Sequence, residues 1–264
     1  MALQFCSFAS GSSGNCYLVR NDHTAILIDA GISGKRIFQG LSDTGTPFEN
    51  VAALLVTHEH IDHVKSLPVV SKKLPNVLVY ANAGTWDGIE RPVAAEKQRV
   101  FQTGQDFQIG EFLIRSFPIP HDAAEPVGFS IYSDGRQISI VTDVGYITEE
   151  IFEEIIDADL LLLEANHEEE ILLMGRYPYP LKRRILGEHG HLSNVNAGKC
   201  LCQLIQRNQK KRQVLLGHLS HENNDPSVAL LAVRNTLMEQ DIIPGNSLRL
   251  EVVLRDCCSC LYEV

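Results

Sequence analysis

The stretch Thr57-His58-Glu59-His60-Ile61-Asp62-His63 brings three imidazoles and an aspartate together within seven residues. It continues the apolar run 51–57 (VAALLVT), which predicts a strand. Alternate residues of an extended segment point the same way, so His58 and His60 can reach one ion together. A turn into a helix then lets Asp62 and His63 face a second ion. Imidazole and carboxylate ligands suit Zn²⁺, Mn²⁺ or Fe²⁺, and without thiolates a purely structural zinc site is the weaker interpretation.

Four ligands cannot hold two ions and leave a reactive site, so further ligands are expected later in the chain. Three candidates follow predicted strands, where sites in α/β proteins commonly gather: His121, Asp143 and His218. His121 would join His58 and His60, whereas Asp143 could bridge both ions through its two oxygens. His218 would complete the second ion. His221 is the alternative, and His218 is favoured because it directly follows its strand.

Two divalent ions at such a site would lower the pKa of a bridging water, so that hydroxide becomes the nucleophile near neutral pH. The local positive charge would attract an anionic substrate, and phosphate oxygens match a two-metal clamp. An ester or a lactam could use the same hydroxide. The metal ligands alone therefore predict a hydrolase without naming its substrate.

Short apolar runs alternate with turn signals along the chain and predict an α/β fold of sheets covered by helices. Strands are expected at 25–29, 51–57, 77–80, 112–117, 128–132, 137–142, 160–164, 213–217 and 248–254. Helices are expected near 148–157, 194–207 and 226–239, with caps at Thr148, Asn194 and Asp225. No repeat or long linker divides residues 1–264, so a single domain is predicted.

Composition excludes several classes of protein. Hydrophobic residues make up 44% and charged residues 21% of the 264 residues, the balance of a globular protein. No apolar stretch is long enough to suggest a membrane span, so no membrane association is expected. The start, MALQFCSFAS, lacks the pattern of a secretory signal, which predicts a cytoplasmic location. The net charge of −10 argues against a nonspecific coat for nucleic acid but not against a nuclease.

The seven cysteines show no spacing typical of a disulfide framework. Three of them fall in Cys257-Cys258-Ser259-Cys260, but no second pair or nearby histidine completes a tetrahedral zinc site. The surrounding VVLRDCCSCLY predicts a terminal strand whose thiols pack as small hydrophobic groups.

The order HxHxDH, single His, single Asp, final His resembles the metallo-β-lactamase superfamily across nearly the whole chain, including Asp29 of LIDAG. The resemblance implies a four-layer αβ/βα sandwich of two mixed β-sheets flanked by helices, with metals at the sheet edge and a structural role for Asp29. Four further stretches are similar to the bacterial YycJ (WalJ)-like group, whose members are regarded as DNA exonucleases acting from 5′ ends in DNA repair. These stretches are FASGSSGN at 8–15, YPYPLKRRI at 177–185, GHLSN at 190–194 and LGHLSHENN at 216–224.

The same resemblance implies roles for residues outside the metal ligands. His191 matches the histidine that RNase Z-type enzymes aim at the scissile phosphate, and Glu164 matches the acid that orients it. A carboxylate that holds an imidazole raises its basicity, which suits it to assist a leaving oxygen. Asp62 is expected to relay a proton from water as well as to bind metal. The catalytic residues predicted are therefore Asp62, Glu164 and His191.

Substrate contacts are predicted in two places. The SGSSGN run could present Ser12, Ser13 and Asn15 to a phosphate, or it could be a tight turn between strands. The run Lys182-Arg183-Arg184 offers charge for a phosphodiester backbone, and Tyr179 offers a ring for a base. A solvated basic run is the ordinary alternative.

Three functions remain open at this stage. The first is a dinuclear-metal phosphodiesterase, a 5′-to-3′ DNA exonuclease whose partner is a DNA end. The second is hydrolysis of a small ester, thioester, lactone or cyclic phosphodiester, which needs the metals but not the Glu164–His191 pair. The third is a di-iron redox or metal-binding protein; such relatives carry H-x-E-x-D, whereas His60 occupies the middle position here. The sequence does not determine the native metal, the choice of DNA or RNA, or the oligomeric state.

Overall fold

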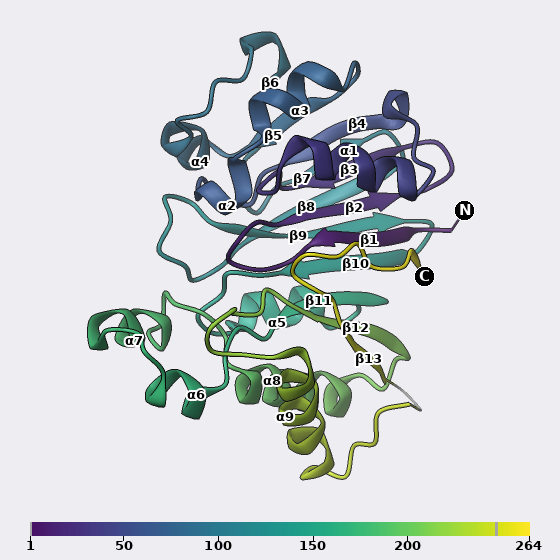
Figure 1. The fold of residues 1–264 in the computed structure, drawn as a ribbon. Helices are drawn as coiled ribbons and strands as arrows, with labels where there is room; N and C mark the ends of the chain where they lie inside the picture. The colour runs from purple at the N-terminus through teal and green to yellow at the C-terminus, as the bar shows by residue number, and fades with distance from the viewer. Residues whose placement is uncertain (1, 246–247) are drawn as a thin grey trace.

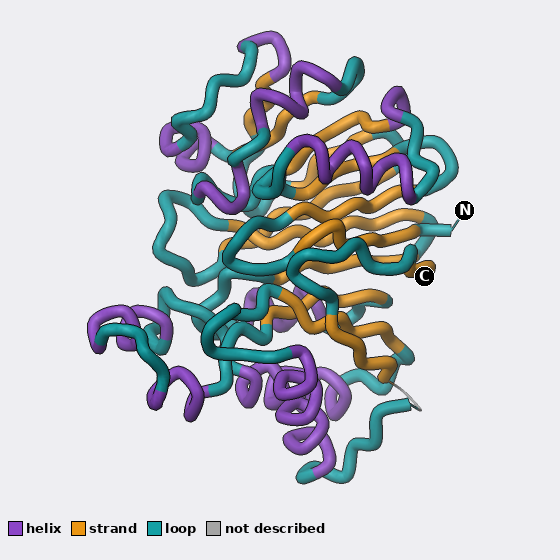
Figure 2. Tube along the Cα trace, viewed as in Figure 1, coloured by secondary structure: helices purple, strands orange, loops and turns teal. Residues whose placement is uncertain are grey.

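Strands that are apolar along their whole length dictate a layered fold, because both of their faces must be covered. The strands β3 (Ala25–Ile28) and β11 (Leu160–Glu164) are buried at every position. The computed structural model describes residues 2–245 and 248–264; Met1, which begins the N-terminal stretch quoted above, lies outside them. In it, each sheet packs one face against the other sheet and the opposite face against helices (Figures 1 and 2). The predicted four-layer αβ/βα sandwich is confirmed.

The first sheet contains the N-terminal strands and the metal-ligand motif. In spatial order its strands are β14 (Tyr262–Glu263), β1 (Gln4–Ala9), β2 (Cys16–Arg20), β3, β4 (Val51–Leu55), β5 (Leu78–Ala81) and β6 (Gln98–Val100). Pairing is antiparallel from β14 to β3 and parallel from β3 to β6.

The second sheet is also mixed. In spatial order its strands are β13 (Leu248–Val252), β12 (Arg212–Gly217), β11, β10 (Arg136–Val141), β9 (Val127–Ser133), β8 (Phe112–Pro118) and β7 (Asp106–Ile109). The strands β10 to β13 run parallel, so their carboxyl ends meet at one edge. This edge carries the site described below.

Helices cover the outer faces through separate apolar cores. Those packed on the first sheet are α1 (Gly34–Asp43) and α3 (Leu67–Lys73); those on the second are α5 (Glu149–Ile155), α8 (Asn194–Arg207) and α9 (Pro226–Met238). Short helices α2 (Ile61–Val64), α4 (Ala83–Gly88), α6 (Glu169–Met174) and α7 (Tyr179–Ile185) gather at one side of the sandwich, on the left of Figure 1. Two 3₁₀ turns occupy Phe48–Asn50 and Ala95–Lys97. Within the described chain, no helix has the length and apolar character needed to span a membrane.

The nine predicted strands correspond to β3–β5 and β8–β13, although the ends differ by a few residues. The three predicted helices are α5, α8 and α9. Thr148 and Asp225 cap their helices as predicted, whereas the cap of α8 is Ser193, whose hydroxyl accepts from the amide of Asn196. Asn194 is the first helical residue, so its prediction as a cap was wrong. The sequence did not reveal β1, β2, β6, β7, β14, α1, α3, α4, α6 or α7, which are mostly short or carry mixed polar and apolar residues.

The prediction of a terminal strand with buried thiols was wrong. The strand β13 ends at Val252, and the chain then crosses to the first sheet, where β14 pairs with β1. The crossing segment forms no strand of its own, although the amide of Ser259 donates to the carbonyl of Ser7 in β1, and it leaves Cys257, Cys258 and Cys260 exposed. The sulfur of Cys258 lies 3.3 Å from that of buried Cys6.

The loop after β3 lies directly against the loop that carries the metal-ligand motif. The amide of Ala30 donates to the carbonyl of His63 at 2.7 Å, and the amide of Asn15 donates to that of Asp62 at 2.9 Å. A Cβ on Gly31 would lie 1.5 Å from the carbonyl oxygen of Asp62. The backbones can approach this closely only because Gly31 has no side chain.

We expect Gly31→Ala to lower the free energy of unfolding by about 1–3 kcal/mol, because the added methyl forces the two loops apart. Urea denaturation of the purified variant measures this. Gly187→Ala is the matched control, since its Cβ would approach no atom closer than 3.2 Å. Equal stabilities of the two variants would show that this contact is not tight in solution.

Candidate metal centre

Chemically active side chains from both sheets meet at the edge where parallel strands end. The motif His58–His63 follows β4 of the first sheet. Asp143, Glu164 and His218 follow or end β10, β11 and β12 of the second sheet, and His121 follows β8. Three groups of potential ligand atoms form there, each within 4.8 Å of one another: His58, His60 and His121; His58, His63 and Asp143; and Asp143, Glu164, His191 and His218.

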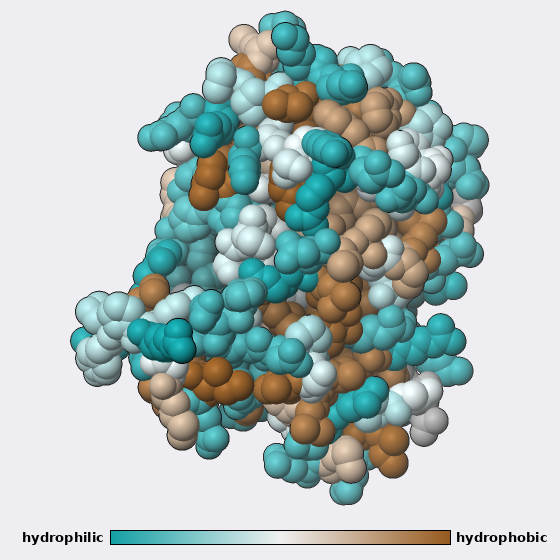
Figure 3. All heavy atoms as spheres, viewed as in Figure 1, coloured by the Kyte–Doolittle hydropathy of each residue, from teal (hydrophilic) through white to brown (hydrophobic). Residues whose placement is uncertain are grey.

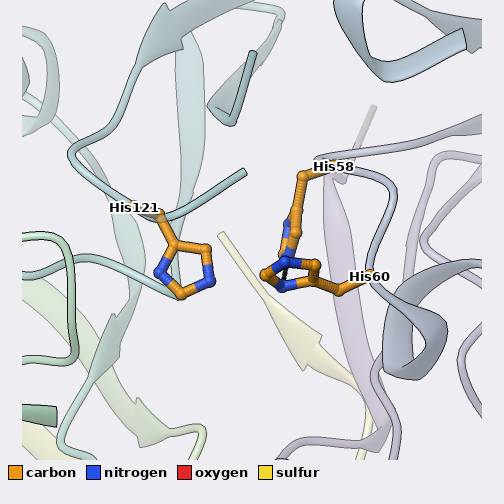
Figure 4. Close-up of side chains that lie close together, drawn as sticks. All are labelled: His58, His60 and His121. Carbon is orange, nitrogen blue, oxygen red and sulfur yellow. Dashed lines mark hydrogen bonds between the residues drawn. The ribbon is translucent and has the colours of Figure 1, made fainter. Parts of the chain in front are cut away.

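The first group is purely imidazole (Figure 4). The Nε2 atom of His58 lies 3.1 Å from Nδ1 of His60, and both rings lie edge-on to that of His121. The Nδ1–H of His121 donates to the carbonyl of Gly190 at 3.3 Å, which leaves its Nε2 lone pair free. Two donors on a tetrahedral ion, each about 2.1 Å from it, lie about 3.4 Å apart. The spacing of His58 and His60 therefore suits one shared cation.

Asp29 orients two of the histidines at once. Its carboxylate accepts from Nδ1 of His63 at 2.7 Å and from the amide and hydroxyl of Thr57 at 2.9 Å. The hydroxyl of Thr57 in turn accepts from Nδ1 of His58 at 3.0 Å. Both imidazoles thus direct Nδ1 at an oxygen acceptor and turn Nε2 into the site, the arrangement that carboxylates impose on metal-binding histidines.

Asp143 lies between the remaining histidines. Its Oδ2 lies 3.2 Å from Nε2 of His63, and its Oδ1 lies 3.2 Å from Nε2 of His218. Asp143 Oδ2 and both ring nitrogens of His218 are buried without a hydrogen-bond partner. The carboxylate of Asp62 lies outside the three groups, 3.6 Å from Nε2 of His63.

Three of these strand ends adopt a left-handed backbone that side chains other than glycine rarely take. The φ angles are 62° at Asp29, 58° at Asp143 and 54° at His218. Each such residue costs about 1–3 kcal/mol, which the surrounding structure must offset. Packing holds His218 there, since its amide donates to Ser10 Oγ at 2.8 Å and its carbonyl accepts from Asn166 at 2.9 Å. This clustering marks the edge as a functional site.

The electrostatics of the cluster also suit cations. Burial lowers the pKa of His58 well below its usual range, and charge on His63 lowers it further, so His58 is neutral, as a metal ligand must be. Burial would also lower the pKa of His63, but the charges of Asp29 and Asp143 raise it well above the usual range. Burial would raise the pKa of Asp143, but His218 and His63 hold it well below the usual range. A proton on His63 compensates the carboxylates, and a bound cation would take over that role.

The buried donor set fits divalent metal ions. Potential ligand atoms lie within 4.8 Å of one another, and the carboxylates of Asp143 and Glu164 supply negative charge. Asp143 Oδ2 and both ring nitrogens of His218 are buried without a hydrogen-bond partner.

Comparison with known proteins agrees with this geometry. The family model "Beta-lactamase superfamily domain" matches residues 24–219. The exodeoxyribonuclease YycJ of Bacillus anthracis is 35% identical over 94% of both chains. The exodeoxyribonuclease WalJ of Streptococcus pneumoniae is 33% identical over 100% of this chain and 99% of its own. The metallo-β-lactamase fold protein YhfI of Bacillus subtilis superposes with a TM-score of 0.74 over 100% of both chains at 15% identity.

The chain is a YycJ-like member of the metallo-β-lactamase superfamily. In this superfamily member two side chains of the third group, Glu164 and His191, also pair with each other. Nδ1 of His191 donates to Oε1 of Glu164 at 2.8 Å, and Oε2 of Glu164 accepts from the amide of Val144 at 2.7 Å. Burial lowers the pKa of His191, but Glu164 raises it more, to about 9. The ring of His191 stacks on that of His218, with centroids 5.4 Å apart.

The residues of the SGSSGN loop differ in their exposure to solvent. Ser12 and Ser13 are exposed, whereas Asn15 is buried and its amide lies 3.0 Å from Nε2 of His63. The side-chain oxygen Oδ1 of Asn15 accepts from the backbone amide of Gly11 and from the hydroxyl of Tyr17. Asn15 is therefore placed to hold the loop against His63 rather than to face solvent.

The basic run also separates into distinct environments. Lys182 donates to the carbonyls of Leu173 and Gly175 at 2.7 Å, so its ammonium is committed within the protein. Arg184 donates to Asp122 at 2.5 Å, and Asp122 lies 3.4 Å from Nε2 of His121. Arg183 is exposed, and Tyr179 is 72% exposed.

Of the two histidines considered for the second ion, one lies in the cluster and the other lies at the surface. The structure brings His218 to Asp143, whereas the side chain of His221 is 74% exposed and pairs with Glu222. Sequence reasoning missed Thr57 as the link between Asp29 and His58, and Asp122 as the partner of Arg184. Thr57 and Asp122 each lie next to a predicted ligand in the sequence, and this position was the only sign of a role. Their contacts with Asp29 and Arg184 join residues far apart in the chain.

Removing the charge of Glu164 should reverse the shift at His191. In Glu164→Gln we expect the pKa of His191 to fall from about 9 to below 6.5, because burial remains and the carboxylate is gone. Imidazole NMR titration of the metal-free protein measures this. The exposed imidazole of His221 in the same spectrum serves as the internal control. An unchanged pKa for His191 would show that the pair is not formed in solution.

Proposed function

We propose that this chain is a metal-dependent phosphodiesterase that degrades DNA from a 5′ end. The observation that carries the proposal is the adjacency of two metal-ligand groups and the Glu164–His191 pair. The relatives named exodeoxyribonuclease, matched over nearly the whole chain, support DNA as the substrate class.

In this proposal His58, His60 and His121 hold one ion, and Asp62, His63 and His218 hold the other, with Asp143 between them. The count of two ions is part of the proposal, as is their identity as Zn²⁺, Mn²⁺ or Fe²⁺. Divalent ions so held lower the pKa of water and neutralise charge on phosphate oxygens. The ligand spacings and the unpartnered atoms of Asp143 and His218 support this assignment.

The protein's own groups then handle the leaving side of the reaction. His191, kept protonated on Nδ1 by Glu164, presents Nε2 to the substrate and donates a proton to the departing sugar oxygen. Its 19% exposed side chain leaves room for this contact. Asp62, 22% exposed beside His63, is placed to accept a proton from the attacking water. We further propose that the chain is a single domain and that it acts in the cytoplasm.

The decisive test incubates 5′-end-labelled, 5′-phosphorylated DNA and RNA with the protein, with EDTA or with added Mn²⁺ or Zn²⁺. We expect release of short labelled products from DNA with metal and none with EDTA. The same DNA labelled at its 3′ end should shorten progressively, which controls for polarity. No cleavage of either polymer under any condition would refute the nuclease, and iron-loaded, coloured protein that is inert towards DNA would favour the redox alternative.

His191→Ala should lower kcat on DNA by about 10²–10⁴-fold, because the leaving oxygen loses its proton donor. Steady-state kinetics at saturating metal measures this, and His221→Ala is the matched control with an exposed imidazole outside the site. An intact kcat on DNA in His191→Ala would show that the pair does not protonate the leaving oxygen. Turnover of a small ester, thioester, lactone or cyclic phosphodiester that survives His191→Ala, with no turnover of DNA, would favour the small-molecule hydrolase.

A further inference from the structure

The helices α6 and α7 form a lobe, residues 168–187, that projects from the body beside the metal centre (Figures 1 and 3). Lys182 binds the two helices together through the carbonyls of Leu173 and Gly175. At the base of the lobe, Arg184 reaches Asp122 next to His121, and the carbonyl of Gly190 accepts from the same His121. The lobe is therefore a unit attached directly to the ligand loop.

Large apolar side chains, which are normally buried, are exposed on this lobe. Met174 is 84% exposed, Tyr179 is 72% exposed and Leu173 is 57% exposed. Tyr179 and Arg183 are four residues apart on α7, so they lie on the same face of the helix. A ring with a guanidinium beside it is the combination that binds a base and its phosphate.

The charge of the lobe also points to a polyanion. Arg176 and Arg183 are exposed and make no ion pair within the described chain. Two of the three acids at its start turn inward, since Glu168 accepts from Asn194 and Glu169 accepts from Ser193, whereas Glu170 is exposed. These arginines stand out on a chain whose net charge is −10.

We infer that the α6–α7 lobe is the surface that holds the DNA strand as single-stranded DNA, with Tyr179 stacked on a base and Arg183 on the adjoining phosphate. Arg184 ties the base of α7 to Asp122 beside His121, so a strand whose end sits at the metal centre would leave along α7, past Arg183 and Tyr179. This inference rests on the proposed nuclease function.

The test measures binding of a fluorescein-labelled single-stranded DNA oligonucleotide to metal-free full-length protein by anisotropy in EDTA. We expect Tyr179→Ala to raise Kd by about tenfold and Tyr179→Phe to restore most of the affinity, because the ring is what stacks. Arg183→Ala should lower the salt dependence, reducing the slope of log Kd against log salt concentration by about 0.7. Thermal unfolding of each variant confirms that the fold is intact.

Arg234→Ala, which removes an exposed arginine of α9, is the matched control and should bind like the wild type. The inference is overturned if wild-type protein degrades DNA but Tyr179→Ala and Arg183→Ala bind the oligonucleotide with wild-type Kd and salt slope. It is also overturned if the variants lose affinity only for duplex DNA or only for RNA. Wild-type protein that neither binds nor cleaves DNA would instead refute the proposed function.

Discussion

Imidazole nitrogens and carboxylate oxygens face one another at this edge of the molecule, and the side chains of His58, His63, Asp143 and His218 among them are buried. Acceptor atoms buried against acceptor atoms are stable only when a proton or a cation lies between them. The rest of the edge serves to hold them in that arrangement. Asp29 sets the direction of two rings, left-handed strand ends aim Asp143 and His218, and Gly31 lets the two supporting loops touch.

The position of the ligands makes the packing of the two sheets part of the chemistry. His58, His60 and His63 belong to the first sheet, while Asp143 and His218 belong to the second. The apolar core between the sheets therefore determines the distance between the two halves of the site. Large side chains fill that core, among them Phe5, Tyr17 and Phe129, and interiors of this density resist small displacements.

The edge proposed to bind DNA differs in charge from the chain as a whole. The chain as a whole carries a net charge of −10, which would repel nucleic acid at a distance. Cations bound by the ligand groups, together with the arginines of the α6–α7 lobe, would change the sign of the field locally. Attraction limited to one edge would favour engagement of a strand end over coating along its length.

The sequence by itself determined the layered α/β fold and predicted the ligand types and their order, because HxHxDH and long apolar strands are local patterns with few physical interpretations. It could also anticipate that Glu164 and His191 form a pair, through family resemblance rather than spacing. Only the tertiary structure decided between His218 and His221, removed Lys182 from the free charges and turned Asn15 inward. It also left the C-terminal cysteines exposed, where the sequence had predicted a strand. Those outcomes depend on contacts between residues far apart in the chain, and a hydrogen bond or an exposed face exists only once the two sheets have packed.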